Sequence, residues 1–115
     1  MGVDVSQMYA LADDLKQAKR KTQRELRVAV AKVVEQTTKT AKSLAPVDTG
    51  NLRDSIEGTV RGSTGEVGTD LEYAQYVEFG TYKDEPEPFI APAADEANAT
   101  LSVEAEAAVA RALGF

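Results

Sequence analysis

The sequence predicts a small α+β protein with a long N-terminal helix, a short β-hairpin or small antiparallel sheet, a short helix and a C-terminal helix. Residues 4–44 lack proline and glycine, and their apolar residues recur every three or four positions, as in an amphipathic helix. A chain of 115 residues supports one domain. We expect a single domain over residues 1–115: a long basic helix (1–44), a motif-bearing hairpin and loop region (45–92) and a C-terminal helix (93–113).

The long helix poses a problem of size. Forty helical residues would extend about 60 Å, whereas a compact domain of this length is only about 30 Å across. The apolar stripe is also interrupted between Ala18 and Leu26. The helix therefore either breaks near residues 19–25, or it projects from the domain and needs a partner.

The middle of the chain contains several local signals. Pro46 ends the long helix, because proline disfavours helix for the residue before it. Asp48 or Thr49 can then cap a short helix that runs through Asn51, Leu52 and Ile56. Alternation around Val60 and Val67 predicts a β-hairpin. Its expected turn is Gly62-Ser63-Thr64-Gly65.

The last part of the chain contains two further helical segments. Leu71, Ala74 and Val77 share a helical face, so residues 71–79 predict a short helix that stops at Gly80. An acidic, proline-containing loop follows. The last helix has Pro92 in its first turn and ends at Gly114. One stripe of this helix carries small and apolar residues, namely Ala93, Ala97, Leu101, Ala105, Ala108 and Ala112.

Charge divides the chain into two parts. The net charge is −6, from 13 basic and 19 acidic residues. Residues 1–44 hold nine basic and five acidic residues, a balance of +4, and residues 45–115 hold four and fourteen, a balance of −10. Oppositely charged parts allow copies of one chain to bind head to tail.

The composition argues against catalysis and metal binding. The chain has no histidine and no cysteine, which removes the commonest general base, the commonest metal ligand and every thiolate site. The acidic residues near the last helix lack the spacing of a calcium loop and indicate a solvated charged segment. They are Asp84, Glu85, Glu87, Asp95 and Glu96. We therefore expect no enzyme activity, no cofactor and no metal.

The sequence also argues against membrane association. No apolar run approaches the roughly 20 residues that a membrane span needs. The N-terminal region carries acids where a secretory signal would carry basic residues. We expect the protein to be made in the cytoplasm.

The candidate functional residues are all candidates for an interface. Arg20, Arg24 and Arg27 lie on one side of the long helix, with Lys16 one turn earlier. This basic stripe is a solvated face, a docking surface for the acidic part of a neighbour, or a contact to DNA phosphates. With a net charge of −6 and no base-reading motif, a dedicated DNA-binding role is disfavoured.

The aromatic residues of the middle region form the second candidate set. Tyr73, Tyr76 and Phe79 are candidates for the core or for an interface, with a nucleic-acid stacking platform as a disfavoured alternative. Tyr82 is a further candidate for the interface. Phe89 and Ile90 lie between prolines and form an apolar plug. The plug pins the loop either to its own domain or to a neighbouring subunit, and the sequence leaves both options open. We expect Phe89→Asp to block assembly and to leave the monomer folded.

Three segments, in this order after a long charged helix, resemble one known family. They are APVDTGNLRDSI (45–56), VGTDLEYAQYVEFGT (67–81) and PFIAPA (88–93). Together they are similar to the phage head–tail joining family named for gene product ten of the lambdoid phage HK-ninety-seven. Members of the family often carry an arginine just before and just after the Pro-Phe element, where this chain has Glu87 and Ala91. That departure speaks against DNA contact through this loop.

The resemblance implies a structural protein of a long-tailed bacteriophage. It implies a tail-completion or head-to-tail joining component of the neck, found in the virion, that forms a homo-hexameric ring. The ring would contact the head connector and the tail-tube or terminator proteins, and DNA would pass through its lumen only as cargo. One alternative is the tail-terminator ring of the same class. An alternative of another class is a small nucleic-acid-binding protein that uses the stripe from Lys16 to Arg27.

Overall fold

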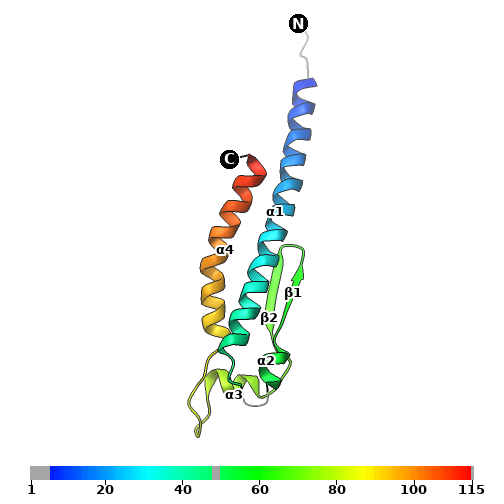
Figure 1. Cartoon of the computed structure of the whole chain (residues 1–115). Coiled ribbons are helices and arrows are strands. Elements are labelled where there is room, and N and C mark those ends of the chain that lie inside the picture. Colours follow the sequence, from blue (N-terminus) through cyan, green and yellow to red (C-terminus); the bar gives the residue numbers. More distant parts are fainter. Residues whose placement is uncertain (1–5, 48–49, 115) are drawn as a thin grey trace.

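The computed structural model describes residues 6–47 and 50–114, and the side chains of its first helix from residue 13 onwards. The predicted cap residues Asp48 and Thr49 lie outside the described residues. The elements are α1 (Ser6–Leu44), α2 (Asn51–Ser55), β1 (Glu57–Arg61), β2 (Thr64–Gly68), α3 (Ala74–Phe79) and α4 (Ile90–Leu113), as Figure 1 shows. The predicted α+β class is confirmed: a long first helix, a two-stranded antiparallel sheet, short helices and a C-terminal helix form a single domain.

The first helix is unbroken. α1 runs for 39 residues, a length of about 58 Å. Within the interrupted stretch of its apolar stripe, the Thr22 hydroxyl donates to the Ala18 carbonyl at 2.8 Å, so its polar group is satisfied without leaving the helix. The molecule measures 83 × 22 × 21 Å and its radius of gyration is 21.0 Å, against about 13 Å for a compact chain of this length. The helix therefore projects rather than breaks.

The C-terminal helix packs antiparallel along α1 through small side chains (Figure 1). Ala29 and Val33 of α1 are buried, as are Ala108 and Ala112 of α4. Alanine contacts let two helix axes approach closely. Two ion pairs join the helices at their margins, Lys32–Glu104 and Glu25–Arg111, each with an N···O distance of 3.0 Å.

The hairpin lies against another side of α1. Strand register pairs Gly58 with Val67 and Val60 with Gly65. A Cβ atom on Gly58 would stand 2.5 Å from Thr38 Oγ1 and 2.6 Å from Val34 Cγ1, and a Cβ on Gly65 would overlap Val34 Cγ2. The two glycines therefore let the sheet lie directly on the helix. Since the other strand residues are mainly exposed, this contact positions the hairpin.

The hairpin turn is shorter than predicted. Gly62 and Ser63 alone connect the strands, and Thr64 and Gly65 already belong to β2. Gly62 has a φ of 58°, which favours glycine in a two-residue turn. The register explains the difference, because Gly65 is needed on the sheet face that meets α1 rather than in the turn.

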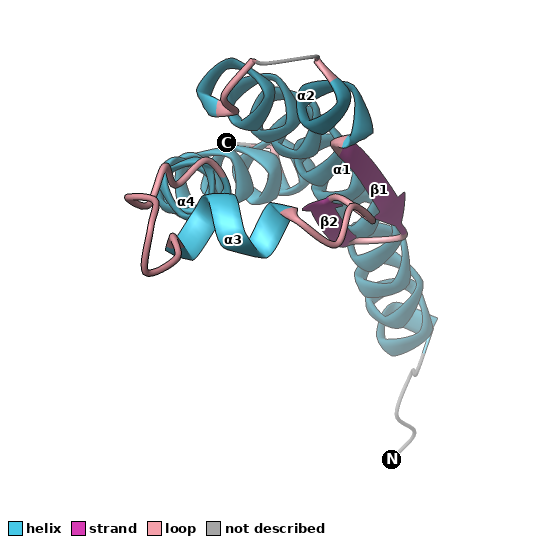
Figure 2. Cartoon of the chain, turned by 90° about the horizontal axis from the view of Figure 1, so that it is seen from below, coloured by secondary structure: helices cyan, strands magenta, loops and turns pink. Residues whose placement is uncertain are grey.

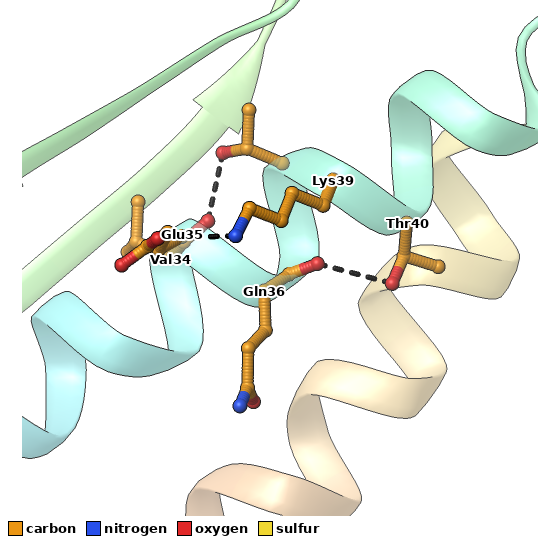
Figure 3. A network of polar contacts seen from close by, with 6 residues as sticks. Val34, Glu35, Gln36, Lys39 and Thr40 are labelled. Carbon is orange, nitrogen blue, oxygen red and sulfur yellow. Dashed lines mark hydrogen bonds and ion pairs between the residues drawn. The ribbon is translucent and has the colours of Figure 1, made fainter.

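The part of α1 near the hairpin satisfies its polar groups within the helix (Figure 3). The Thr38 hydroxyl donates to the Val34 carbonyl at 2.7 Å, and the Thr40 hydroxyl donates to the Gln36 carbonyl at 3.0 Å. The Lys39 ammonium pairs with Glu35 at 3.2 Å. Thr38 can therefore lie under Gly58 without an unsatisfied hydroxyl.

The hydrophobic core lies at the end of the molecule opposite the projecting helix, where α2 and α3 flank the end of α1 (Figure 2). Its buried members are Ala41, Ala45, Leu52, Ile56, Ala74, Phe89 and Ala93. The predicted helix over residues 71–79 is present but begins at Ala74. Gly80 ends it with a φ of 76°, as predicted. The C-terminal helix begins at Ile90, three residues earlier than predicted, and ends at Leu113 with Gly114 as its C-cap.

Candidate interaction surfaces

The basic stripe is exposed on α1. Arg20, Arg24 and Arg27 line a broad polar hollow beside the last turn of α4, together with Ala18 and Ala112. None of the three arginines forms an ion pair within the part of the chain that the structure describes. Their charges are therefore available to a partner. The structure places them together, and it does not identify that partner.

The projecting part of α1 also carries uncovered apolar surface. Leu15 is 63% exposed. Helical spacing puts it on the side of α1 that faces α4 further along, where Ala29 and Val33 are buried. Near its end, α4 pairs with α1 through Arg111 and Glu25, and residues 13–17 of α1 are all exposed. Figure 1 shows α1 continuing well past the C-terminal end of α4.

An exposed aromatic surface lies at the opposite end of the molecule. Tyr73 and Tyr76 are exposed, Phe79 is 78% exposed and Tyr82 is 93% exposed. The first three lie three residues apart and so share one face of α3 and its preceding turn. The Lys83 ammonium lies 5.5 Å from the centroid of the Tyr82 ring. These four residues are therefore surface residues and not part of the core.

Phe89 does not belong with these surface residues. It is 1% exposed and is one of the two largest fully buried side chains, in the cluster with Ile56 and Ala93. Ile90 is half-buried against the same cluster. The sequence left two options open for Phe89 and Ile90. In the structure these residues attach the loop to its own domain. The expectation that Phe89→Asp leaves the monomer folded is wrong, because it would bury a carboxylate in this cluster.

Glu78, which the sequence did not single out, organises the start of α4. Its carboxylate accepts hydrogen bonds from the backbone N–H groups of Phe89 (2.8 Å), Ile90 (3.1 Å) and Ala91 (2.8 Å). The next residue is Pro92, which has no N–H. All four N–H positions at the start of the helix are thus accounted for. The available signal was a proline-rich helix start without a Ser, Thr, Asp or Asn cap.

The pKa of Glu78 reflects this arrangement. Desolvation by burial raises the pKa of the carboxyl, but the three backbone hydrogen bonds to Phe89, Ile90 and Ala91 together outweigh it, so the pKa is lowered. The charged form is favoured, and it also interacts well with the positive end of the α4 dipole. Glu78 thereby ties α3 to α4 and fixes the two ends of the intervening loop.

The loop itself folds back on α3. The Gly80 N–H donates to the Tyr76 carbonyl at 2.8 Å, and the Glu87 N–H donates to the Val77 carbonyl at 2.8 Å. Gly80 has a positive φ, and a Cβ on it would stand 2.8 Å from the nitrogen of Pro86. These contacts fix the two ends of the loop on α3, and Tyr82 and the acidic residues of the loop are exposed to solvent.

A groove runs between the hairpin and α4, with α1 as its floor. Its cavity volume is about 260 Å³ and its lining is mainly apolar. Val30, Val33 and Thr37 form the floor, Gly65 and Val67 of β2 form one wall, and α4 forms the other wall from Ile90 to Leu101. Sequence reasoning did not find this groove, because it depends on how the hairpin and α4 diverge around α1.

Other kinds of site have no support in the part of the chain that is described. No group of three or more acidic side chains there is arranged to hold a metal ion. No described helix is both long and apolar enough to span a membrane.

Comparison with known proteins places the chain in a family. Residues 9–80 match the model of a family described as "Bacteriophage HK97-gp10, putative tail-component". The chain belongs to this phage tail-component family. The match runs from α1 through α3. It contains the first of the three segments that resemble the family and all but the last residue of the second, and it stops before the PFIAPA element and α4. No curated protein and no solved structure matches the chain.

Membership of the family indicates where the exposed surfaces of the protein act. The family is one of structural tail components, so the protein is a phage structural protein of the virion and its contacts are with other virion proteins. The exposed arginines, Leu15 and the aromatic face are therefore candidates for contacts within a virion assembly.

Proposed function

We propose that this chain is a tail-completion protein, which forms a hexameric ring at the head-proximal end of the tail and joins the tail to the head. One observation carries the proposal most strongly. An elongated protomer leaves two different surfaces uncovered towards its opposite ends: the side of α1 with the exposed Leu15 and the basic stripe, and the aromatic face of α3 with its acidic loop. Exposed aromatic residues gathered on one face are typical of protein–protein contacts.

Two different surfaces on one protomer favour a closed ring. Contacts between unlike surfaces are heterologous, and they close into a ring when the rotation between protomers divides a full turn. The charge balance of +4 in residues 1–44 and −10 in residues 45–115 supports such contacts. The role is mechanical, since assembly needs only binding surfaces.

The neighbours follow from the proposed position. The ring would contact the head connector on one side and the tail-tube or terminator proteins on the other, after assembly in the host cytoplasm. Six copies fit the six-fold symmetry of long tails. DNA would pass through the lumen as cargo. The loop that follows the aromatic face of α3 is acidic rather than basic, so it would not bind DNA phosphates.

The test is a phage in which this gene carries an amber mutation. For a tail-completion protein, non-suppressing cells accumulate DNA-filled heads and tails of normal length that do not join, and added purified protein restores infectious particles. Tails of abnormal length would identify a terminator instead. Normal particles that lack the protein would contradict both structural roles.

A further inference from the structure

We propose that a basic hollow on α1 of one copy binds the aromatic and acidic surface around α3 of the next copy. The basic hollow is lined by four exposed cationic side chains, those of Arg20, Lys21, Arg24 and Arg27. The aromatic and acidic surface consists of the exposed side chains of residues 70–88. This inference rests on the proposed ring and names the two surfaces that would close it.

The two surfaces carry opposite charge. The carboxylate of Asp14 also lines the basic hollow, so four cations and one anion give a balance of +3. The exposed charged side chains of residues 70–88 are five acids and one base, a balance of −4. They are Asp70, Glu72, Asp84, Glu85, Glu87 and Lys83. Electrostatic complementarity therefore favours the pairing of one surface with the other.

The charges of both surfaces are free to pair between copies. Each ion pair within the described parts of the chain involves other side chains. The one remaining acid of residues 70–88 is Glu78, which is half-buried and accepts hydrogen bonds from the backbone at the start of α4. It is therefore not counted in the balance of −4.

The side chains of the two surfaces also match in kind. An arginine guanidinium stacks on aromatic rings and pairs with carboxylates, so a surface that offers both suits it. Tyr76 is 56% exposed, Phe79 78% and Tyr82 93%. The Lys83 ammonium lies 5.5 Å from the centroid of the Tyr82 ring, which is a contact of the same type within one chain. Tyrosine and arginine are also enriched among the residues that dominate binding energy at interfaces.

The lengths of the two surfaces agree. Arg20 and Arg27 lie on one side of α1 and are about 10 Å apart along its axis. Tyr73 and Phe79 are about 9 Å apart along α3 and its preceding turn. The Glu87 N–H donates to an α3 carbonyl at 2.8 Å, so the acidic loop is held next to this helix (Figure 2).

The two surfaces cannot meet within one chain. The basic hollow lies beside the last turn of α4, whereas α3 lies near the opposite end of the molecule (Figure 1). Arg27 is about 20 Å along α1 from Ala41, which packs in the core cluster that includes Ala74 of α3. Two like surfaces would repel each other, so the contact joins unlike surfaces of two copies, as a closed ring requires.

Reciprocal charge reversal tests the contact. One variant carries Arg20→Glu and Arg24→Glu, a second carries Asp84→Arg and Glu85→Arg, and a third carries all four changes, each at an exposed position. The first and second variants should self-associate at least about tenfold more weakly than wild type. The third should regain association, because its two reversed surfaces attract each other again. Light scattering at low salt and the concentration needed to complement tails of the amber phage measure this, and circular dichroism verifies folding.

A mixture of the first and second variants should also recover. The reversed hollow of one variant then meets the reversed loop of the other, and their native surfaces meet in the same way. Six copies allow such alternation around a ring. Loop changes cannot restore a contact that the hollow makes with DNA or with another virion protein.

Two results would overturn the inference and leave the proposed function standing. One is that neither the third variant nor the mixture recovers, which would assign the hollow to DNA or to another virion protein. The other is that the first and second variants behave like wild type. A wild-type protein that is absent from particles would overturn both the inference and the proposed function.

The matched controls change the same amount of charge elsewhere on the surface. Lys39→Glu with Arg61→Glu reverses two exposed bases outside the hollow, and Glu57→Arg with Glu66→Arg reverses two exposed acids on the hairpin. Both controls should keep self-association within about twofold of wild type, because surface charges away from the contact are screened by salt. Losses equal to those of the test variants would show that net charge, and not the two named surfaces, governs assembly.

A substitution in α3 tests the role of the rings. Phe79→Leu removes an exposed aromatic ring and keeps an apolar side chain, and it should weaken self-association about two- to fivefold. Phe79→Tyr keeps the ring and should leave self-association unchanged. Light scattering at low salt compares the two variants. Equal association of the leucine variant and wild type would contradict stacking of arginine on this ring.

Discussion

The two halves of α1 carry the same kind of apolar stripe but differ in what covers it. From Leu26 onwards the stripe is covered by α4 and the hairpin, and Ala29 and Val33 are buried. In the projecting half Leu15 is exposed. The covered half contributes to the core, whereas Leu15 in the projecting half buries little apolar surface in the isolated chain. One amphipathic pattern can therefore be buried along one part of a helix and exposed along another, depending on which elements pack on it.

The largest expected difference separates core and surface aromatics. Phe89→Ala should lower the free energy of unfolding by about 3–5 kcal/mol, because it empties the space of a fully buried ring. Phe79→Ala, at a 78% exposed position, should change it by less than about 0.5 kcal/mol. Urea unfolding followed by circular dichroism measures both. Similar losses from the two changes would refute the division between core and surface.

The addition of one methyl group at Gly65 should disrupt the contact between the hairpin and α1. Gly65→Ala should cost about 1–3 kcal/mol of stability, because its Cβ would overlap Val34. Gly68→Ala in the same strand is the control, since nothing lies within 4 Å of a Cβ there. Thermal unfolding should separate the two variants. Equal stability would mean that the hairpin does not lie on α1 in solution.

The anchor between α3 and α4 should depend on pH. Glu78→Gln should cost about 1–2 kcal/mol near neutral pH, because the N–H groups of Phe89, Ile90 and Ala91 lose their charged acceptor. The pKa of Glu78 is lowered in the folded state. Its contribution is therefore fully present above the ordinary carboxyl pKa and is lost as the pH falls through the lowered value.

The measurement is urea unfolding of both proteins at several pH values between neutral and strongly acidic. The gap between wild type and Glu78→Gln should close as the pH falls. Glu72→Gln, at an exposed position beside α3, is the control and should show a small gap at every pH. A gap for Glu78→Gln that does not depend on pH would contradict the role of its charge.

The smallest expected effect belongs to the ion pairs that join α1 to α4. Lys32→Met should cost at most about 1 kcal/mol, because the Lys32–Glu104 pair is partly exposed and screened by salt. The cost should shrink further in high salt, as measured by thermal unfolding. A larger cost that does not depend on salt would indicate that the pair, and not the alanine packing, holds the two helices together.

Local signals in the sequence predicted most elements for identifiable reasons. Pro46 ended α1, and Gly80 and Gly114 ended α3 and α4 with positive φ values. These residues act through their own backbone preferences, which the sequence states directly. The four-residue hairpin turn was wrong, because Gly65 is required by its contact with Val34. A contact across many residues leaves no local signal.

The candidate site was predicted only in part for the same reason. The basic side with Arg20, Arg24 and Arg27 follows from helical spacing. The burial of Phe89 and the capping by Glu78 do not, since both depend on where α3 places the start of α4. The groove depends on three elements at once.

The α+β class, the long helix, its charge and the family could be predicted from the sequence, because periodicity, turn residues and motifs act locally. The packing of the elements was needed to show that α1 stays unbroken and that Phe89 is buried while Tyr76 and Phe79 are exposed. It also decided that a projecting helix and an open groove remain. The physical reason is that periodicity marks a face of a helix as apolar, whereas the lengths and placement of α4 and the hairpin decide which part of that face is covered.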